Sequence, residues 1–216
     1  MDWFAGFLEK YPDYRRKVIL SQIAPPTRET MSAYADIRHE LETLSGSING
    51  RYGELDWVPI QYIHRTTPRK MLVEVFRNSR IGLVTPLRDG MNLVAKEYVA
   101  AQNPEDPGVL ILSRFAGAAE QLKEALIVNP YDIEEMADSI KVALEMGLTE
   151  RRERFEALLA GVRRHDTFGW CRSFLNTLEG AGRRSALAIP TSPSEAARKA
   201  LQEIELARVS PRLRPN

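Results

Sequence analysis

Short apolar runs alternate along the first 180 residues with longer segments in which apolar side chains recur every three or four positions. Within each run most positions are apolar, and β-branched residues are frequent. This pattern is typical of parallel strands that are buried on both faces. We therefore predict five strands, at residues 18–24, 60–63, 81–85, 109–112 and 126–128.

The segments between these runs have the period of amphipathic helices. They predict helices at 30–48, 69–77, 91–102 and 133–146, a charged helix that begins near Thr149, and a last helix at 167–178. Strands and helices that alternate with short connections form βαβ units, so the predicted fold is α/β with a doubly wound parallel sheet. Ligands bind such folds beyond the carboxyl ends of the strands, so chemistry is expected in the connections that follow strands.

Composition narrows the class of protein without changing this picture. The 216 residues are 44% hydrophobic and 27% charged, with a net charge of +1 and a single cysteine. A chain with a net charge near zero has no overall positive potential that would attract nucleic acid. A single cysteine excludes an internal disulfide and a cysteine metal cluster. No run reaches the roughly 18 apolar residues of a membrane helix, and no secretory signal is recognisable, so we expect a cytoplasmic protein without a membrane or nucleic-acid partner.

The charge balance changes near residue 180. From Arg183 onward there are seven Lys and Arg against three Asp and Glu, together with four prolines. This composition predicts a basic and largely disordered tail over 181–216, with a short helix at 194–209 that would be marginal by itself. The folded domain is accordingly expected to cover residues 1–180.

The connection after the third predicted strand carries the strongest candidate chemistry. Pro86 stops the strand, and a turn at 88–90 follows, in which Gly90 can take a positive φ. A helix then opens at Met91 or Asn92. The first amides of a helix have no intrahelical acceptor, and together with the helix dipole they form an anion site suited to a diphosphate.

Two carboxylates accompany this helix start. Asp89 precedes it and is suited to accept hydrogen bonds from sugar hydroxyls, whereas Glu97 lies one turn along the helix, within reach of the vicinal hydroxyls of a ribose. The spacing alone leaves a plainer interpretation equally open, in which Asp89 caps the helix of an ordinary βα turn and Glu97 is solvated.

The run at 82–102, Gly-Leu-Val-Thr-Pro-Leu-Arg-Asp-Gly-Met-Asn-Leu-Val-Ala-Lys-Glu-Tyr-Val-Ala-Ala-Gln, resembles the donor-binding signature of trehalose-6-phosphate synthases. Those proteins are retaining, UDP-glucose-dependent glycosyltransferases of family 20, with the GT-B fold. The resemblance covers about residues 4–180, including segments 22–28, 48–53, 113–119 and 125–132 and the pair His165-Asp166. It implies that the chain is the C-terminal, Rossmann-like domain of that fold.

The resemblance also implies a set of contacts to UDP-glucose. It gives Asp89 and Arg28 catalytic roles, on the transferred glucose and on the donor phosphate. It also implies that the amides of Gly90, Met91 and Asn92 face the glucose and that the amides of Leu93 and Val94 bind the diphosphate. It further implies that Glu97 contacts the ribose, and that Ile23 and the main chain at Thr67 contact the uracil. No cofactor and no metal is implied, because the leaving diphosphate itself accepts the proton of the acceptor sugar.

Two parts of the family pattern have no counterpart in this sequence. The acceptor-binding N-terminal domain is one, and an Arg-Leu-Asp-Tyr-x-Lys-Gly-Leu run, whose Arg and Lys grip the diphosphate, is the other. We therefore expect no trehalose 6-phosphate synthesis by this chain alone, and a separate N-terminal glycosyltransferase chain is a candidate partner, as is a second copy. A non-catalytic UDP-sugar-binding or interaction module, or the inactive product of a truncated gene, are the alternatives.

Overall fold

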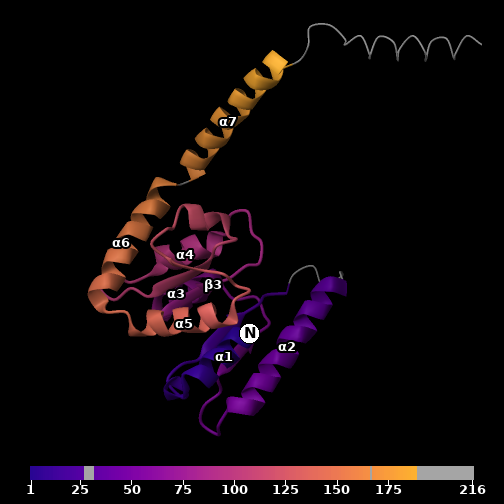
Figure 1. Ribbon diagram of the computed structural model, residues 1–216, viewed down its shortest axis with the longest axis vertical. Coiled ribbons are helices and arrows are strands. Elements are labelled where there is room, and N and C mark those ends of the chain that lie inside the picture. The colour runs from indigo at the N-terminus through magenta and orange to yellow at the C-terminus, as the bar shows by residue number, and fades with distance from the viewer. Residues whose placement is uncertain (27–31, 166, 189–216) are drawn as a thin grey trace, which may run out of the picture. The chain divides into compact units, whose positions relative to one another are not determined.

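The computed structural model describes residues 1–26, 32–165 and 167–188 (Figure 1). They belong to two units, a compact one at Met1–His165 and a second one of which a single helix is described. The strands are β1 (Leu20–Ile23), β2 (Ile60–Ile63), β3 (Ile81–Val84), β4 (Val109–Ser113) and β5 (Leu126–Val128). All five predicted strands are confirmed, each within two residues of its expected bounds at either end.

The helices follow the prediction with one addition. They are α1 (Asp2–Lys10), α2 (Ser32–Tyr52), α3 (Arg69–Asn78), α4 (Leu93–Ala101), α5 (Ile133–Glu145), α6 (Leu148–Arg164) and α7 (Thr167–Ala188), with short 3-10 turns at Pro12–Tyr14 and Gly117–Glu120. Helix α1 is the addition. Its buried residues Phe4, Phe7 and Leu8 do have helical spacing, but two turns give too little periodicity to be distinctive.

The strands are parallel throughout, but they lie in two sheets. One sheet pairs β1 with β2, and the other has the order β3-β4-β5. The expected α/β fold with parallel strands is therefore present, whereas a single continuous sheet is not found among the described residues. The two sheets still share one core, because Ile60 of β2 and Ile111 of β4 belong to the same buried cluster.

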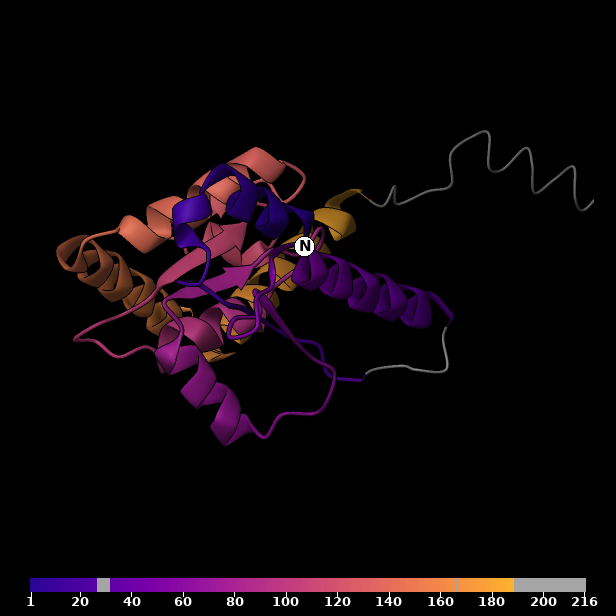
Figure 2. The same cartoon turned by 90° about the horizontal axis from the view of Figure 1, so that it is seen from below.

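Helices cover both faces of the strands, as the alternation along β4 shows. Val109 and Ile111 face a cluster that includes residues of α1, α2 and α5, whereas Leu110 and Leu112 face a cluster built with α4 and α6. Helices α1 and α5 lie side by side on the first face, and α3 contacts α4 on the second (Figure 2). This two-faced arrangement is that of a doubly wound domain.

A tyrosine sets the distance between α4 and the strands below it. Tyr98 is buried, and its hydroxyl donates a hydrogen bond to the carbonyl of Ser79 at 3.0 Å. A Cβ at Gly82 would stand 2.6 Å from the Tyr98 ring, and one at Gly108 would stand 2.1 Å from its hydroxyl. Both glycines are therefore needed for the ring to lie across β3 and the start of β4.

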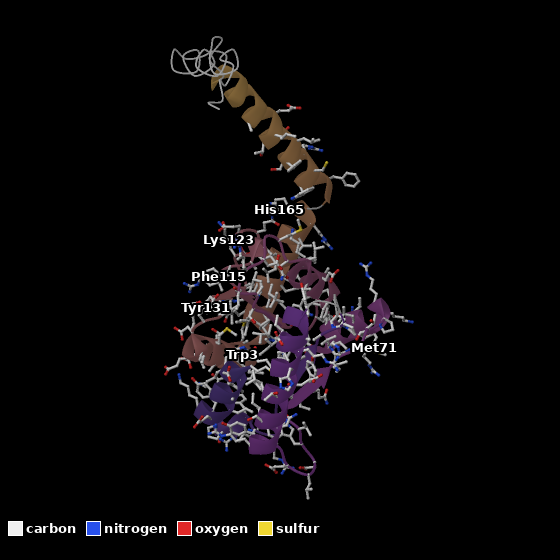
Figure 3. All side chains as sticks on the ribbon, turned by 90° about the vertical axis from the view of Figure 1, so that its right-hand side faces the viewer. Trp3, Met71, Phe115, Lys123, Tyr131 and His165 are labelled. Atoms are coloured by element: carbon white, nitrogen blue, oxygen red, sulfur yellow. The ribbon has the colours of Figure 1, made fainter. Side chains whose placement is uncertain are left out.

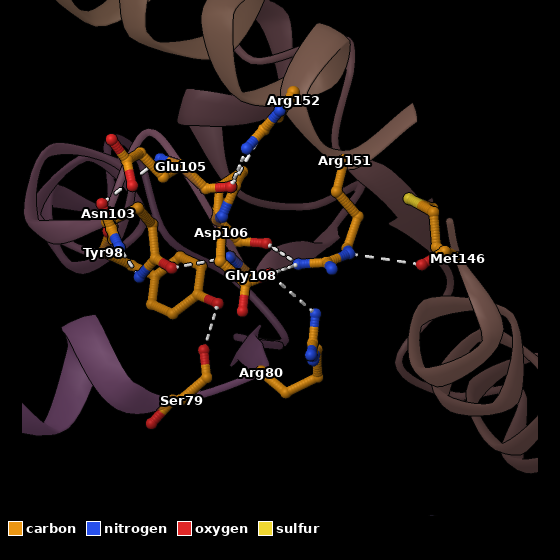
Figure 4. Close-up of polar contacts among 12 residues, drawn as sticks. Ser79, Arg80, Tyr98, Asn103, Glu105, Asp106, Gly108, Met146, Arg151 and Arg152 are labelled. Carbon is orange, nitrogen blue, oxygen red and sulfur yellow. Dashed lines mark hydrogen bonds and ion pairs between the residues drawn. The ribbon is translucent and has the colours of Figure 1, made fainter. Parts of the chain in front are cut away.

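The amino ends of β3 and β4 are closed by a polar network around a buried arginine (Figure 4). The Arg151 guanidinium donates to the Asp106 carboxylate at 2.6 Å, to the Pro107 carbonyl, and through Nε to the Met146 carbonyl at 3.2 Å. Arg80 adds a longer contact to Asp106, at 3.4 Å. The network fastens α6 to the loop that precedes β4.

The predicted domain boundary near Gly180 falls within a helix. Helix α7 continues without a break to Ala188, so the first eight residues of the predicted disordered tail are helical. On α7 the rings of Trp170 and Phe174 stack 5.5 Å apart. The predicted helix at 194–209 lies outside the described residues.

Candidate functional site

The candidate turn lies at the carboxyl end of β3, and the loop after β4 adjoins it. Thr85 to Asn92 connect β3 to α4, and Arg114 to Ala118 follow β4. The two connections come from neighbouring parallel strands, since β3 pairs directly with β4. This is the end of a doubly wound sheet at which ligands bind.

The Asp89 carboxylate is held by its own turn. One oxygen accepts the Met91 amide at 3.0 Å, and the other accepts the Asn92 side-chain amide at 2.9 Å. Asp89 does not cap α4, which rules out the capping role of the plainer interpretation. Both carboxylate oxygens have a fixed direction, and each keeps a further lone pair for an outside donor.

Asn92 is the N-cap of α4 and carries the strained backbone of the turn. Its side-chain oxygen accepts the Ala95 amide at 2.9 Å, and its φ is 73°. Gly90, which could take a positive φ, does not do so, and the turn places its left-handed residue two positions later. Asparagine tolerates this region and here gains a hydrogen bond from it, which glycine could not supply.

The first turn of α4 is open to solvent. The helix begins at Leu93, slightly later than predicted, and the exposed Leu93 and Val94 precede the first intrahelical hydrogen bond. Glu97 is also exposed, one turn further along. The helix thus begins shortly after Asp89 and carries Glu97 one turn further along, and the Met91 amide is already engaged by Asp89.

The loop after β4 holds this turn in place, a role that the sequence pattern did not reveal. The Asp89 amide donates to the Phe115 carbonyl at 3.3 Å, the Gly117 amide donates to the Asp89 carbonyl at 2.9 Å, and the Ala118 amide donates to the Met91 carbonyl at 2.7 Å. A Cβ at Gly117 would stand 2.2 Å from the Gly90 carbonyl oxygen. Only glycine permits this approach, so Gly117 is a supporting residue of the site.

Apolar side chains surround the candidate turn at the surface. Phe115 and Tyr131 meet edge to face with ring centroids 5.9 Å apart, and both are exposed (Figure 3). Leu87, Met91, Leu93, Val94 and Ile133 are also exposed at this end. Soluble proteins seldom expose such a group without an interaction partner, which points to a surface that contacts another molecule or domain.

The remaining predicted site residues lie on the other sheet. Ile23 ends β1, and Thr67 lies between β2 and α3; both are half-buried. A hydrogen bond of 2.9 Å between His64 Nδ1 and the Ala24 carbonyl joins the two connections. No hydrogen bond or ion pair found in the described part of the chain links Ile23 or Thr67 to the Asp89 turn, and Arg28 lies outside that part.

Other candidate features are few. A hollow of about 220 Å³ is lined by Arg77, Arg80 and Asp106 among others, at the amino ends of the strands and away from the candidate turn. Among the residues with described positions, no group of three His, Cys, Asp or Glu side chains is arranged to hold a metal ion. No helix in those same residues has the length and apolar character needed to cross a membrane.

Comparison with known proteins gives concordant matches. Residues 1–180 match glycosyltransferase family 20. The chain is 53% identical over 182 residues to a trehalose-6-phosphate synthase of Enterobacter sp. (strain 638) and 54% identical over 182 residues to one of Klebsiella pneumoniae, in each case over 84% of this chain and 38% of the relative. The chain thus spans about two-fifths of the length of the curated relatives that it matches.

Solved structures agree with these sequence matches. One, described as trehalose-6-phosphate from Escherichia coli bound with UDP-2-fluoro glucose, is similar with a TM-score of 0.79 and 52% identity, over 82% of this chain and 39% of that one. Another is an α,α-trehalose-phosphate synthase (UDP-forming) from Burkholderia xenovorans in complex with glucose-6-phosphate. It has a TM-score of 0.79 and 54% identity, over 82% of this chain and 39% of that one.

Proposed function

Because the chain belongs to glycosyltransferase family 20, we propose that it forms the donor-binding part of a trehalose-6-phosphate synthase and holds UDP-glucose at the start of α4. The observation that carries this proposal is the turn between β3 and α4. It combines a helix N-terminus open to solvent with the fixed carboxylate of Asp89 and the exposed carboxylate of Glu97.

The proposed contacts follow the chemistry of the donor from sugar to base. Asp89 accepts hydrogen bonds from glucose hydroxyls through its remaining lone pairs, and the amides of Leu93 and Val94 bind the diphosphate at the positive end of the helix dipole. Glu97 accepts both ribose hydroxyls. Gly90, Met91 and Asn92 line the glucose, whereas Ile23 and Thr67 flank the uracil, and Arg28 adds charge at the phosphates.

The proposed reaction transfers glucose from UDP to the 1-hydroxyl of glucose 6-phosphate with retention of configuration. The bond from the glucose C1 to the diphosphate oxygen breaks, and a bond from C1 to the acceptor oxygen forms on the same face. The acceptor proton passes to the leaving diphosphate, so the protein supplies positioning and charge stabilisation rather than a nucleophile. The first amides of α4 act where negative charge develops.

We assign this chain the donor half only. Every contact proposed above is to UDP-glucose, and the chain spans only 38% of the Enterobacter relative. Catalytic turnover would then require a second polypeptide that corresponds to the remaining part of the longer relatives. With UDP-glucose and glucose 6-phosphate, the purified chain should bind the donor without releasing UDP at an enzymatic rate.

Titration calorimetry with UDP-glucose tests the assignment. The folded chain should bind one equivalent, and Glu97→Ala should weaken binding about tenfold, the loss expected when charge-assisted hydrogen bonds of about 1.5 kcal/mol are removed. Glu156→Ala removes an equally exposed helical glutamate on α6 and serves as the matched control. A folded chain that shows no heat of binding at millimolar UDP-glucose would refute the proposal.

A further inference from the structure

The hollow at the amino ends of β3 and β4 is lined by polar residues and one glycine. It lies between the end of α3 and the loop that precedes β4, and Figure 4 shows Arg80, Asn103 and Asp106 among its lining residues. Its volume of about 220 Å³ equals that of roughly seven water molecules in the liquid, at about 30 Å³ each. A ligand held there must therefore be small, and it must gain its affinity from polar contacts.

The charged side chains around the hollow leave an excess of positive charge. Arg77 and Arg80 line it together with Asp106. The Asp106 carboxylate is already neutralised by the buried guanidinium of Arg151 at 2.6 Å, and its contact with Arg80 is longer, at 3.4 Å. In the described part of the chain, the Arg77 side chain has no hydrogen bond or ion pair. The two lining arginines therefore carry charge that the lining carboxylate does not balance.

The end of α3 would ordinarily disfavour an anion, because the free carbonyls of a last helical turn carry partial negative charge. In this helix, the side chains of Asn78, Ser79 and Gln102 donate hydrogen bonds to three carbonyls of that turn, at 2.7, 2.6 and 2.7 Å. These carbonyls are thus satisfied within the protein. The charge of the hollow is then set by the arginines at and just after the helix end.

A side-chain amide adds a third donor. The Asn103 side-chain oxygen accepts the Glu105 amide at 3.2 Å, which orients the group. No acceptor for Asn103 Nδ2 is found among the residues with described positions. Two guanidinium groups and an amide offer more N–H donors than the two oxygens of a carboxylate can accept. They suit the three or four oxygens of a phosphate, which arginine binds through paired hydrogen bonds.

We propose that this hollow binds a dianionic phosphate group, as inorganic phosphate or as the phosphate of a small monoester, between Arg77, Arg80 and Asn103. A phosphate group fills only part of about 220 Å³, so a small ester also fits. The bound group joins the end of α3, the start of β3 and the loop before β4. The site lies at the opposite ends of the strands from the proposed donor site, and it does not depend on UDP-glucose binding.

NMR on the full chain, titrated with inorganic phosphate at constant ionic strength, tests the site. Phosphate should shift the amides of Ser79, Arg80 and Gly108 in a saturable manner. These shifts should arise separately from any at Leu93 and Val94, where the donor diphosphate is proposed to bind. A second titration with glycerol 3-phosphate distinguishes the two sources. Tighter binding than that of inorganic phosphate assigns the hollow to a monoester, and equal or weaker binding assigns it to free phosphate.

A double variant and its control examine the two arginines. Arg77→Gln combined with Arg80→Gln should weaken phosphate binding at the hollow by at least about tenfold, the effect of losing a charge-assisted hydrogen bond. Arg163→Gln combined with Arg164→Gln removes the same charge from two exposed arginines at the end of α6 and should leave binding unchanged. If the first double variant does not fold, Arg77→Gln alone replaces it, since it breaks no contact found in the described residues.

The substitution Asp106→Asn supplies a change of opposite sign. It removes a negative charge that faces the hollow and releases Arg80 from its ion pair, so phosphate should bind the folded variant about threefold more tightly. A merely structural role of these residues would not tighten binding. The proposal is overturned by the absence of saturable shifts at millimolar phosphate, by equal weakening in the two double variants, or by weaker binding in Asp106→Asn. Each of these outcomes is independent of the UDP-glucose titration.

Discussion

The two ends of the β3–β4 pair are built in opposite ways. At the amino ends, Arg151 is buried, and its guanidinium is surrounded by the Asp106 carboxylate and two carbonyls. At the carboxyl ends, the hydrogen bonds found in the described residues tie Asp89 and the start of α4 to their own turn and to the loop after β4, and apolar side chains are exposed nearby. The first end satisfies its buried polar groups internally and stabilises the fold. The second end leaves hydrogen-bonding capacity at its surface, which is where we propose that the donor binds.

The substitution Arg151→Ala should show most clearly that the two ends of the β3–β4 pair have different roles. It leaves the carbonyls of Pro107 and Met146 without their donor and removes a buried packing partner, so the free energy of unfolding should fall by about 2–3 kcal/mol. Affinity for UDP-glucose should stay unchanged, because the network lies at the opposite ends of the strands. Urea unfolding and calorimetry on the same sample measure both. A tenfold loss of affinity in a folded variant would contradict the separation.

Gly117→Ala should act on the other end. The new Cβ would meet the Gly90 carbonyl oxygen at 2.2 Å, and since the obstacle is backbone, the candidate turn must move. A cost of about 2 kcal/mol in unfolding free energy is typical of such overpacking, and UDP-glucose affinity should fall more than tenfold. Gly147→Ala places a Cβ in open space and is the matched control. Unchanged affinity in Gly117→Ala would mean that the position of the turn does not matter for binding.

Asn92→Ala should have a smaller effect on stability. It removes the cap of α4 and leaves alanine at a φ of 73°, for a combined cost of about 1–2 kcal/mol. Asn92→Gly restores backbone freedom and should recover part of that cost while the cap stays absent. Thermal unfolding of the unsubstituted protein, Asn92→Ala and Asn92→Gly measures the order of their stabilities. If alanine and glycine behave alike, then the backbone strain is not what asparagine relieves.

The smallest expected effect is on the pH dependence of stability, and it arises from the polar network at the amino ends of β3 and β4. The Arg151 guanidinium, hydrogen-bonded to Asp106, lowers the pKa of that carboxyl below its ordinary value of 3.8. Because this pKa is lowered by folding, the ionised Asp106 contributes fully to stability above about pH 4. That contribution is lost as the pH falls through the folded-state pKa. Asp106→Asn should therefore lower the free energy of unfolding near neutrality and flatten its pH dependence below about pH 4. An identical acid limb in both proteins would show that Asp106 is not responsible.

The sequence predicted those features that depend on local pattern. The five strands and the start of α4 beside Asp89 are properties of hydrophobic runs, of Pro86 and of a turn, all of them within a few residues. It did not reveal that Gly117 supports the turn, because that role depends on two loops 25 or so residues apart meeting in space. The sequence also did not reveal that the positive φ of the turn lies at Asn92 rather than at Gly90. Both glycine and asparagine tolerate that region, and only the fold selects Asn92.

The division into two sheets was likewise beyond the sequence pattern. Apolar runs such as 18–24 and 81–85 predict that strands are buried, but the identity of each neighbour is set by crossovers that span the whole domain. Helix α1 escaped prediction because its two turns carry little periodicity. The predicted contacts of Ile23 and Thr67 with the base of the donor stay predictions.

The orientation of helix α4 depends on how Tyr98 is packed. The ring is confined by Gly82 and Gly108, whereas the amides assigned to the diphosphate are five residues away, about 7 Å along the axis. A tilt of roughly 10° at Tyr98 would displace those amides by about 1 Å, which exceeds the tolerance of a good hydrogen bond. If the proposed diphosphate site is correct, the position of its amides depends on how tightly the Tyr98 ring is confined by Gly82 and Gly108. Substitutions that loosen the ring should then weaken donor binding before they impair folding.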